Sequence, residues 1–255
     1  MKKITLAAAL ATVLSTNVQA DALGIYLGGQ IWDNQASGTF GNISSQVDFN
    51  LADEQQGNFF IAFEHPLPLI PNARISYTSL QTNGMATLDS DFDFDNETFN
   101  SGADVSTDFN VSYVDYTLYY ELFDNDLISF DFGLTARDFN GNVAVFTQLS
   151  SETDTFTQPS SIAITDIIPM LYVATNIGLP FTGLNLYGHG NLLSVDDHTL
   201  YDYEVGVSYE LIDNLLIDVN VNVGYRSVKL KLEDLNDLYS DIELDGLLIG
   251  TTIHF

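Results

Sequence analysis

The most constraining feature of this chain is a strict alternation of apolar and polar residues that recurs in ten segments. Because successive side chains of a β-strand point to opposite faces, a period of two predicts strands with one apolar and one polar face. The sequence therefore predicts an all-β fold. The segments cover residues 23–32, 58–64, 74–78, 113–122, 128–137, 166–179, 184–192, 201–211, 217–226 and 247–255.

The connections between these segments alternate in length, which is typical of an up-and-down antiparallel barrel whose two ends differ. Short turns fall at residues 66–72, 123–126, 180–183 and 212–214. Longer connections cover residues 34–56, 82–107 and 140–161, and two further ones lie near Asp196 and Asn236. Because ten strands is an even number, both chain ends are expected at the short-turn end. We expect a bulge or a strand end at Pro169, which has no N–H to donate to a ladder.

The composition of the two faces decides which one points outward. One face carries the charged residues Asp115, Asp131, Glu204, Glu210, Asp218 and Arg226. The other face is apolar and has aromatic residues near its ends, namely Tyr201, Tyr203 and Tyr225 at one rim and Tyr209 and Phe255 at the other. A soluble barrel would turn its apolar face inward, which leaves these aromatic rims unexplained. A membrane-spanning barrel with its apolar face toward lipid explains both features.

The amino-terminal residues have the pattern of an export signal. Two lysines precede an apolar run from Ile4 to Leu14, and Val18-Gln19-Ala20 places small residues where a signal peptidase cleaves. The sequence therefore predicts a cleaved signal peptide at residues 1–20 and one barrel domain at 21–255. The apolar run is too short for a membrane-spanning helix, which needs about 20 residues.

Charge and cysteine content exclude several classes of function. Two of the seven basic residues precede Asp21 and all 35 acidic residues follow it, so the exported chain carries 5 − 35 = −30 formal charges. Such an acidic chain, without a basic tract, repels nucleic acid. The absence of cysteine excludes disulfides, thiolate chemistry and cysteine-based metal sites.

Several short motifs resemble a family of small, functionally uncharacterised outer-membrane β-barrel proteins of Gram-negative bacteria. They lie at residues 64–72 (Glu64-His65-Pro66, Pro68 and Pro71-Asn72), 118–121 (LYYE), 134–137 (LTAR), 169–172 (PMLY), 179–184 (LPFTGL), 224–226 (GYR) and 254–255 (HF). The resemblance covers nearly the whole exported chain. It implies the barrel fold and location in the cell outer membrane after export through the inner membrane. It implies no activity and no catalytic residues.

Charged residues on the inward face predict how the barrel interior is filled. Two groups are expected: Glu64, Arg74 and Glu121 near the short-turn end, and Arg137 and Arg226 among Asp131, Asp202 and Glu204 farther out. Charges inside a narrow barrel need partners or water, so ion pairs that plug the lumen are expected. The alternative is a selectivity ring in a narrow pore for small solutes or ions. We favour the plug, because open channels occur in wider barrels.

Catalysis is the third alternative and has weak support. Ser194, Asp196, Asp197 and His198 cluster in one outer connection, which supplies residue types for general-base catalysis in a loop-borne hydrolase. No recognisable catalytic motif accompanies them, and Asp and Ser are ordinary turn residues. The sequence therefore favours a non-enzymatic structural or surface-interaction role.

Three further features concern ligands and partners. Asp89, Asp91, Asp93 and Asp95 alternate with other residues, and they suggest either weak Ca²⁺ binding without an EF-hand pattern or a hairpin with one acidic face. Lys229 and Lys231 would face lipopolysaccharide phosphates if their strand keeps its phase past Ser227, although Val228, Leu230 and Leu232 suggest that the apolar face switches there. No other cofactor is expected. The final alternation, Ile249, Thr251, Ile253 and Phe255, is interpreted as the signal for the barrel-assembly machinery.

Overall fold

The computed structural model describes residues 23–125, 127–150, 155–195, 198–214, 216–235 and 238–255, and all regular elements in them are β-strands. The strands are β1 (Gly24–Gly41), β2 (Gln46–Val47), β3 (Glu54–Glu64), β4 (Asn72–Thr78), β5 (Gln81–Thr87), β6 (Phe92–Phe94), β7 (Glu97–Phe99), β8 (Asp104–Asn110), β9 (Tyr113–Asp124), β10 (Ile128–Phe139), β11 (Gly141–Ser150), β12 (Thr155–Ile164), β13 (Ile167–Leu179), β14 (Leu184–Val195), β15 (His198–Asp213), β16 (Asp218–Leu235) and β17 (Leu238–His254). The expected signal peptide at residues 1–20 lies outside the described residues. The described residues contain no helix long and apolar enough to cross a membrane.

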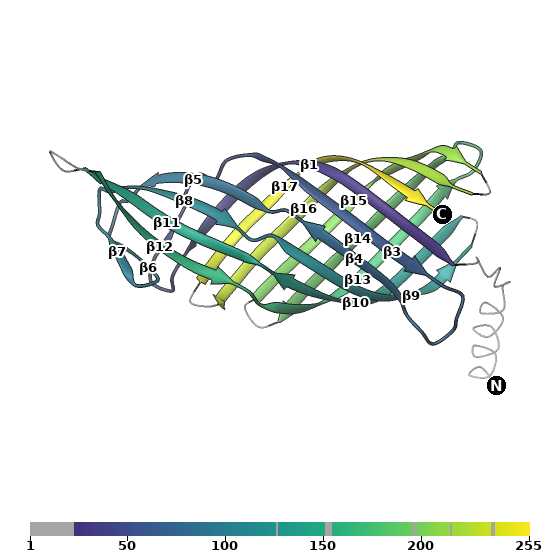
Figure 1. The fold of residues 1–255 in the computed structure, drawn as a ribbon, viewed down its shortest axis with the longest axis horizontal. Coiled ribbons are helices and arrows are strands. Elements are labelled where there is room, and N and C mark those ends of the chain that lie inside the picture. Colours follow the sequence, from purple (N-terminus) through teal and green to yellow (C-terminus); the bar gives the residue numbers. More distant parts are fainter. Residues whose placement is uncertain (1–22, 126, 151–154, 196–197, 215, 236–237) are drawn as a thin grey trace, which may run out of the picture.

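Ten strands form a closed antiparallel barrel in the order β1-β3-β4-β9-β10-β13-β14-β15-β16-β17 (Figure 1). The barrel closes between β1 and β17, whose register runs from Tyr26↔His254 to Gly41↔Tyr239. Each of the ten alternating segments lies in one barrel strand, so the predicted fold class and strand count are confirmed. The described chain begins at the same end of the barrel as its carboxyl terminus, called the inner end below, and the opposite end is called the outer end (Figure 1).

Pro169 does not produce a bulge in β13. The ladder between β10 and β13 passes through Ala136↔Pro169 without a register shift. On its other side, the ladder with β14 begins only at Leu171↔Leu192. Pro169 therefore lies beyond the end of the ladder with β14, where its missing N–H breaks no hydrogen bond. The expected strand end is present on one side of β13, and the expected bulge is not.

The barrel wall carries an outward-facing apolar belt toward the inner end. Its residues are exposed although they are large and apolar, as expected for a surface that faces lipid. They include Leu23, Ile25, Leu27, Ile31, Phe59, Ile61, Phe63, Ile75, Tyr77, Tyr116, Leu118, Phe130, Phe132, Leu134, Leu171, Val173, Leu186, Leu192, Tyr203, Val205, Val207, Tyr209, Val223, Tyr225, Leu247 and Ile249. This finding confirms the predicted orientation of the two faces and excludes a barrel with an apolar interior at this level.

The long connections at the outer end fold into further β-structure. β5, β8, β11 and β12 form a four-stranded sheet, and β6 pairs with β7 in a separate hairpin. Together they make an extension that projects beyond the β14–β15 and β16–β17 hairpins (Figure 1). The extension strands β5, β8 and β11 directly follow or precede the barrel strands β4, β9 and β10. One wall of the barrel is therefore prolonged outward and the other is not.

The inward face of this outer region is apolar. β1, β15, β16 and β17 contribute to this outer core beside the extension, since their outer halves also continue past the apolar belt. The outer core contains Phe40, Phe49, Leu51, Leu80, Leu88, Phe92, Phe94, Phe99, Val105, Phe109, Val111, Phe139, Val143, Val145, Ile162, Ile164, Leu200, Val228, Leu230, Leu232, Leu238, Ile242 and Leu244.

The acidic stretch that begins at Asp89 forms part of this core. Phe92 and Phe94 are 0% exposed, whereas Asp91 and Asp93 are exposed. Phe92 pairs in register with Phe99 across the β6–β7 hairpin. The hairpin with one acidic face is therefore confirmed, and its other face is fully buried.

Candidate functional site

A network of two arginines and two aspartates spans the barrel interior where the apolar belt ends. Arg137 on β10 binds Asp115 on β9 in a two-pronged contact, with Nε–Oδ1 and Nη2–Oδ2 distances of 2.8 Å. These residues are directly opposite each other in the β9–β10 ladder. Arg137 Nη2 also donates to Asp202 Oδ2 on β15 at 2.7 Å. Because β10 and β15 are separated by β13 and β14 in the barrel order, this second contact ties two separate parts of the wall together.

Arg226 on β16 completes the network. Its Nε and Nη2 atoms donate to Asp202 Oδ1 and Oδ2, each at 2.9 Å. Nη2 also lies 3.0 Å from the hydroxyl oxygen of Tyr113 and 3.2 Å from Oγ1 of Thr78. Two-pronged arginine–carboxylate contacts combine charge attraction with fixed geometry. Asp202 thus holds two guanidinium groups at once, so it is the central residue of the network.

Aromatic rings fix the orientation of both guanidinium groups. Arg137 lies over the ring of Tyr113, 3.6 Å from the ring centroid, and Arg226 lies 5.1 Å from the centroid of Trp32. The Tyr113 hydroxyl donates a 2.6 Å hydrogen bond to Asp202 Oδ2. The side chain of Arg137 is 0% exposed. Stacking on aromatic faces and a buried setting restrict both arginines to one arrangement.

A second polar cluster surrounds Glu204, closer to the inner end. Gln30 Nε2 and the Tyr187 hydroxyl each donate a 2.7 Å hydrogen bond to Glu204, and His189 Nε2 lies 3.8 Å from its Oε2 atom. The side chain of Tyr187 lies over the backbone of Gly206 and Gly224. A Cβ atom at these positions would be 2.7 and 2.8 Å from the Tyr187 hydroxyl. Both positions therefore require glycine for Tyr187 to reach Glu204.

The third polar group lies near the inner end. The Tyr119 hydroxyl donates to Glu64 Oε1 at 2.7 Å. Asp131 stands opposite Glu121 in the β9–β10 ladder. Arg74 lies over the ring of Phe60, 3.5 Å from the centroid, and forms no ion pair within the described residues.

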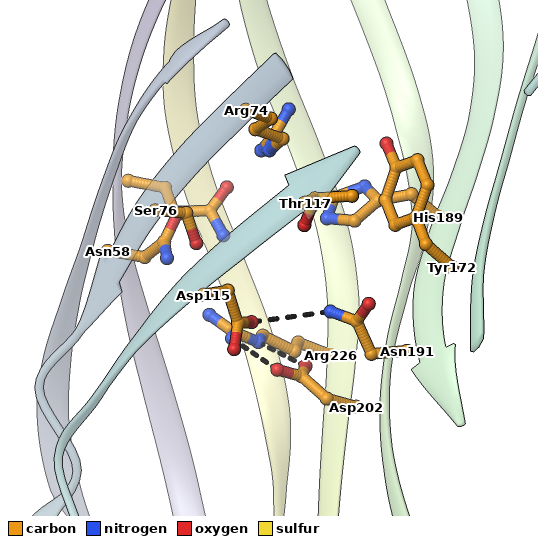
Figure 2. A pocket seen from close by; sticks show the side chains of 11 residues that line it. Asn58, Arg74, Ser76, Asp115, Thr117, Tyr172, His189, Asn191, Asp202 and Arg226 are labelled. Carbon is orange, nitrogen blue, oxygen red and sulfur yellow. Dashed lines mark hydrogen bonds and ion pairs between the residues drawn. The ribbon is translucent and has the colours of Figure 1, made fainter. Parts of the chain in front are cut away.

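A small cavity lies beside the arginine–aspartate network. Side chains from several walls line a cavity of about 20 Å³, and among them Arg74 lies apart from the Arg226–Asp202 pair (Figure 2). This volume has room for roughly one water molecule. Asp115 and Asn191 close it on one side with a 3.3 Å hydrogen bond from the Asn191 amide. A solute larger than water does not fit into this cavity.

The structure places the predicted lumen residues in three levels. Arg137, Arg226 and Asp202 meet in the ion-pair network, but Glu204 belongs to the Gln30–Tyr187 cluster and Asp131 lies near the inner end with Glu121. Sequence reasoning did not propose Asp115 as a partner for Arg137. The short turn at residues 123–126 signals only that the two strands pair. A register shift between Phe130 and Asp131 then places Asp115, and not Tyr116, opposite Arg137.

Other predicted sites remain separate from this interior. His198 Nδ1 accepts a hydrogen bond from the backbone N–H of Glu233 at 3.3 Å, and among the described residues it does not bond Ser194. Asp196 and Asp197 lie outside the described residues. The described residues contain no group of three or more His, Cys, Asp or Glu side chains that could hold a metal ion.

The acidic hairpin residues expected near Ca²⁺ have partners in their own hairpin. Asp91 Oδ1 accepts a hydrogen bond from the N–H of Ser101, and Asp93 Oδ1 accepts one from the Thr98 hydroxyl. Asp89 and Asp95 are exposed beside them. The weak Ca²⁺ site stays a prediction.

The β16 strand keeps its phase past Ser227, so Lys229 and Lys231 do point outward. Lys229 Nζ lies 2.5 Å from Asp241 and 3.7 Å from Glu243, and Lys231 Nζ lies 3.7 Å from Glu233. Carboxylates on the protein itself therefore neutralise the two lysines that were expected to face phosphates.

The carboxyl-terminal strand completes the barrel seam. Ile249, Thr251 and Ile253 pair with β1, and the backbone of Phe255 exchanges hydrogen bonds of 3.0 and 3.3 Å with Ile25. His254 stacks on Tyr26 with 4.2 Å between ring centroids.

A closed ten-stranded barrel with an apolar belt and a charged interior is the fold of bacterial outer-membrane β-barrel proteins. The outer membrane protease OmpT from Escherichia coli has a similar structure, with a TM-score of 0.54 and 12% identity over 94% of this chain and 99% of that one. Ail of Yersinia pestis (TM-score 0.32, 10% identity, 92% of this chain and 99% of that one) and the neisserial surface protein NspA (0.35, 11%, 91% and 97%) also match. No protein-family model and no curated protein sequence matches the chain. The likeness to OmpT establishes the fold and carries no activity.

Proposed function

We propose that this protein is a non-enzymatic component of the cell outer membrane, with a sealed lumen and a surface-interaction role carried by its outer extension. The observation that carries this proposal is the succession of two barriers along the interior. The first is the Arg137–Asp202–Arg226 network, and the second is the apolar outer core. An ion that passed the first barrier would have to cross the second without hydrogen-bond partners.

A planar-bilayer measurement tests the sealed lumen against the narrow pore. The folded wild-type protein should insert without producing steady conductance. Arg226→Ala should remain closed as well, because the outer core still blocks the interior. Folding of the protein used is verified by a difference in gel mobility before and after boiling, since a closed barrel resists unravelling in detergent, and insertion is verified by co-flotation of the protein with vesicles of the same lipid. A stable wild-type conductance would refute the seal.

The location in the outer membrane is supported by the apolar belt and by the seam that β17 forms with β1. Deleting Phe255 removes the backbone contacts with Ile25 and should lower the amount of protein in the outer-membrane fraction without blocking export. Phe181→Ala, at an exposed inner turn, is the matched aromatic control and should assemble normally. Normal outer-membrane levels of the deletion variant would count against a terminal assembly signal.

The absence of catalysis is part of the proposal and has its own test. His198 uses its Nδ1 atom to accept the Glu233 N–H, and Ser194 is not its partner in the described chain. We expect no hydrolysis of peptides or lipid A by the purified barrel. Turnover that disappears in His198→Ala would establish the hydrolase alternative instead.

A further inference from the structure

An open groove of about 510 Å³ lies on the outer surface where β3 separates from β5. The β3–β4 ladder ends at Asn58↔Thr78, followed by a hydrogen bond from Ser79 N to Gly57 O. Beyond this point β3 has no ladder on this edge within the described chain, while its other edge stays paired with β1 as far as Glu54. The groove is of a size that accommodates a small ligand.

One buried side chain forms the floor between the separated strands. Gln56 donates from Nε2 to the backbone oxygen of Gln81 at 2.5 Å and accepts from the backbone nitrogen of the same residue at 3.3 Å. Main-chain contact resumes only at Ala52, whose N–H donates to Asn83 O at 2.8 Å. The side chain of Gln56 thus replaces a stretch of ladder and holds the groove open at a fixed width.

The walls of the groove are built almost entirely from carboxamides and carboxylates. Strand pairing aligns them in rows: Gln81 stands opposite Asn110 on β8, which stands opposite Asn142 on β11, and Asn83 stands opposite Asp108. Gln55 and Glu54 complete the lining on the β3 side. The side chains of Gln55, Gln81, Asp108 and Asn142 make no hydrogen bonds within the described residues, so their polar atoms are available to a ligand.

The lining selects for hydroxyl groups and against other ligand classes. Each amide offers both donors and an acceptor, and each carboxylate offers acceptors. No lysine or arginine lines the groove, and Glu54 and Asp108 repel phosphate and sulfate. Its one large apolar lining residue, Phe109, is only 2% exposed, so an apolar peptide anchor finds no contact. Sugar hydroxyls both donate and accept hydrogen bonds, which matches this set.

We propose that this groove binds a neutral oligosaccharide. The inference rests on the surface-interaction role proposed above and names its ligand class. The groove begins directly beyond Tyr77, the last outward apolar residue of β4, and therefore lies just outside the lipid. Sugars of the surrounding lipopolysaccharide and soluble glycans both reach this height.

Binding of defined sugars to the folded barrel in detergent tests the proposal. The probes are maltohexaose, cellohexaose, chitohexaose and lacto-N-tetraose, and lipopolysaccharide with and without its outer sugars. We expect at least one probe to bind the wild type, and a double variant, Gln55→Leu with Asn142→Leu, to bind it about tenfold more weakly because two hydrogen bonds are lost. A matched control, Gln35→Leu with Asn100→Leu, changes the same residue types at exposed positions outside the groove and should bind as the wild type does.

The outcomes separate ligand source, ligand class and parent proposal. Binding only to lipopolysaccharide with outer sugars assigns the groove to the surrounding membrane, and binding to a soluble oligosaccharide assigns it to an external glycan. No binding of any probe at about 1 mM, or equal weakening in the groove and control variants, overturns the inference. If the barrel does not conduct and no sugar binds, only the proposal of a sugar-binding groove is refuted. If the barrel conducts and a sugar binds, only the proposal of a sealed lumen is refuted.

Discussion

The inner and outer halves of the barrel use the same strands in opposite ways. On β16, Val223 and Tyr225 point outward and Arg226 points inward within the belt region, whereas Lys229 points outward and Leu230 inward beyond it. The strand keeps one phase throughout, so the backbone does not change. The surroundings change, because lipid contacts the outer face of one half and water contacts the outer face of the other. Alternation alone therefore defines two faces without saying which one is inside.

Different forces hold the two halves together. The inner half encloses hydrogen-bonded charges, which tie β9 and β10 to β15 and β16. The outer half encloses a close-packed apolar core like that of a soluble protein. We therefore expect a substitution in the inner network to destabilise the whole barrel. A substitution in the outer core should destabilise mainly the extension.

The largest effect is expected for Asp202→Asn. Asparagine keeps the shape of the side chain but leaves Arg226 without its counterion and Arg137 with only Asp115. Leaving a buried charge uncompensated should lower the free energy of unfolding by about 3 to 5 kcal/mol. Urea unfolding of the folded barrel in detergent measures it. The control Asp138→Asn, one residue from Arg137 but on the outward face, should change the value by less than about 0.5 kcal/mol; equal effects would contradict the network.

Phe94→Ala should have a smaller and more local effect. Phe94 is 0% exposed and packs edge-on against Phe40, with ring centroids 6.1 Å apart. Its truncation should destabilise the extension by about 3 kcal/mol. Amide hydrogen exchange should then accelerate in β6, β7 and β8 by about a hundredfold and remain unchanged in β14 and β15. Met85→Ala, on the outward face of β5, is the control, and uniform acceleration over the whole barrel would contradict the separation of the halves.

The smallest effect is expected for Lys229→Met. Burial tends to lower the pKa of Lys229, but the hydrogen bond and charge of Asp241 outweigh it and raise the pKa above its ordinary value of 10.5. Since Asp241 is half exposed, the pair should contribute less than about 1 kcal/mol.

The direction of the pKa shift gives this small effect a pH dependence. A raised pKa in the folded state means that the contribution is complete below pH 10.5 and is lost as the pH rises through the raised value. The stability difference between wild type and Lys229→Met should therefore be constant at neutral pH and shrink in alkali. A difference that grows with pH would contradict the assigned ion pair.

The sequence predicted the ten barrel strands because their alternation is long and their turns are short. It did not predict that the outer connections continue as paired strands over a second core. Val143 and Val145 on β11, or Phe92 and Phe94 on β6, alternate with polar or small residues as the belt residues do, but their apolar side chains point inward. Whether the apolar face of a strand points outward or inward depends on whether that part of the strand lies within the lipid or outside it. A local sequence pattern does not contain this information.

The sequence predicted which charged side chains point into the barrel, but it did not predict all of their partners. Arg137 and Asp115 lie on the two strands of one hairpin, but they stand opposite each other only because of the register shift between Phe130 and Asp131. Glu204 stands directly opposite Arg226, yet Arg226 binds Asp202, one position along the face. The contact between Arg137 and Asp202 crosses between strands that are not paired. Such contacts depend on how the closed barrel brings its walls together and on side-chain direction.

The central claim is that the outward face of the barrel contacts lipid in the inner half and water in the outer half. The most direct test is to measure where along β16 the outward face passes from lipid to water. The chain has no cysteine, so single cysteines placed at Val223, Tyr225, Lys229 and Lys231 can each carry one spin label. In the protein reconstituted into bilayers, labels at Val223 and Tyr225 should collide mainly with oxygen dissolved in lipid, and labels at Lys229 and Lys231 mainly with a water-soluble nickel complex. A lipid environment at both lysine positions, or a water environment at Val223, would contradict the account.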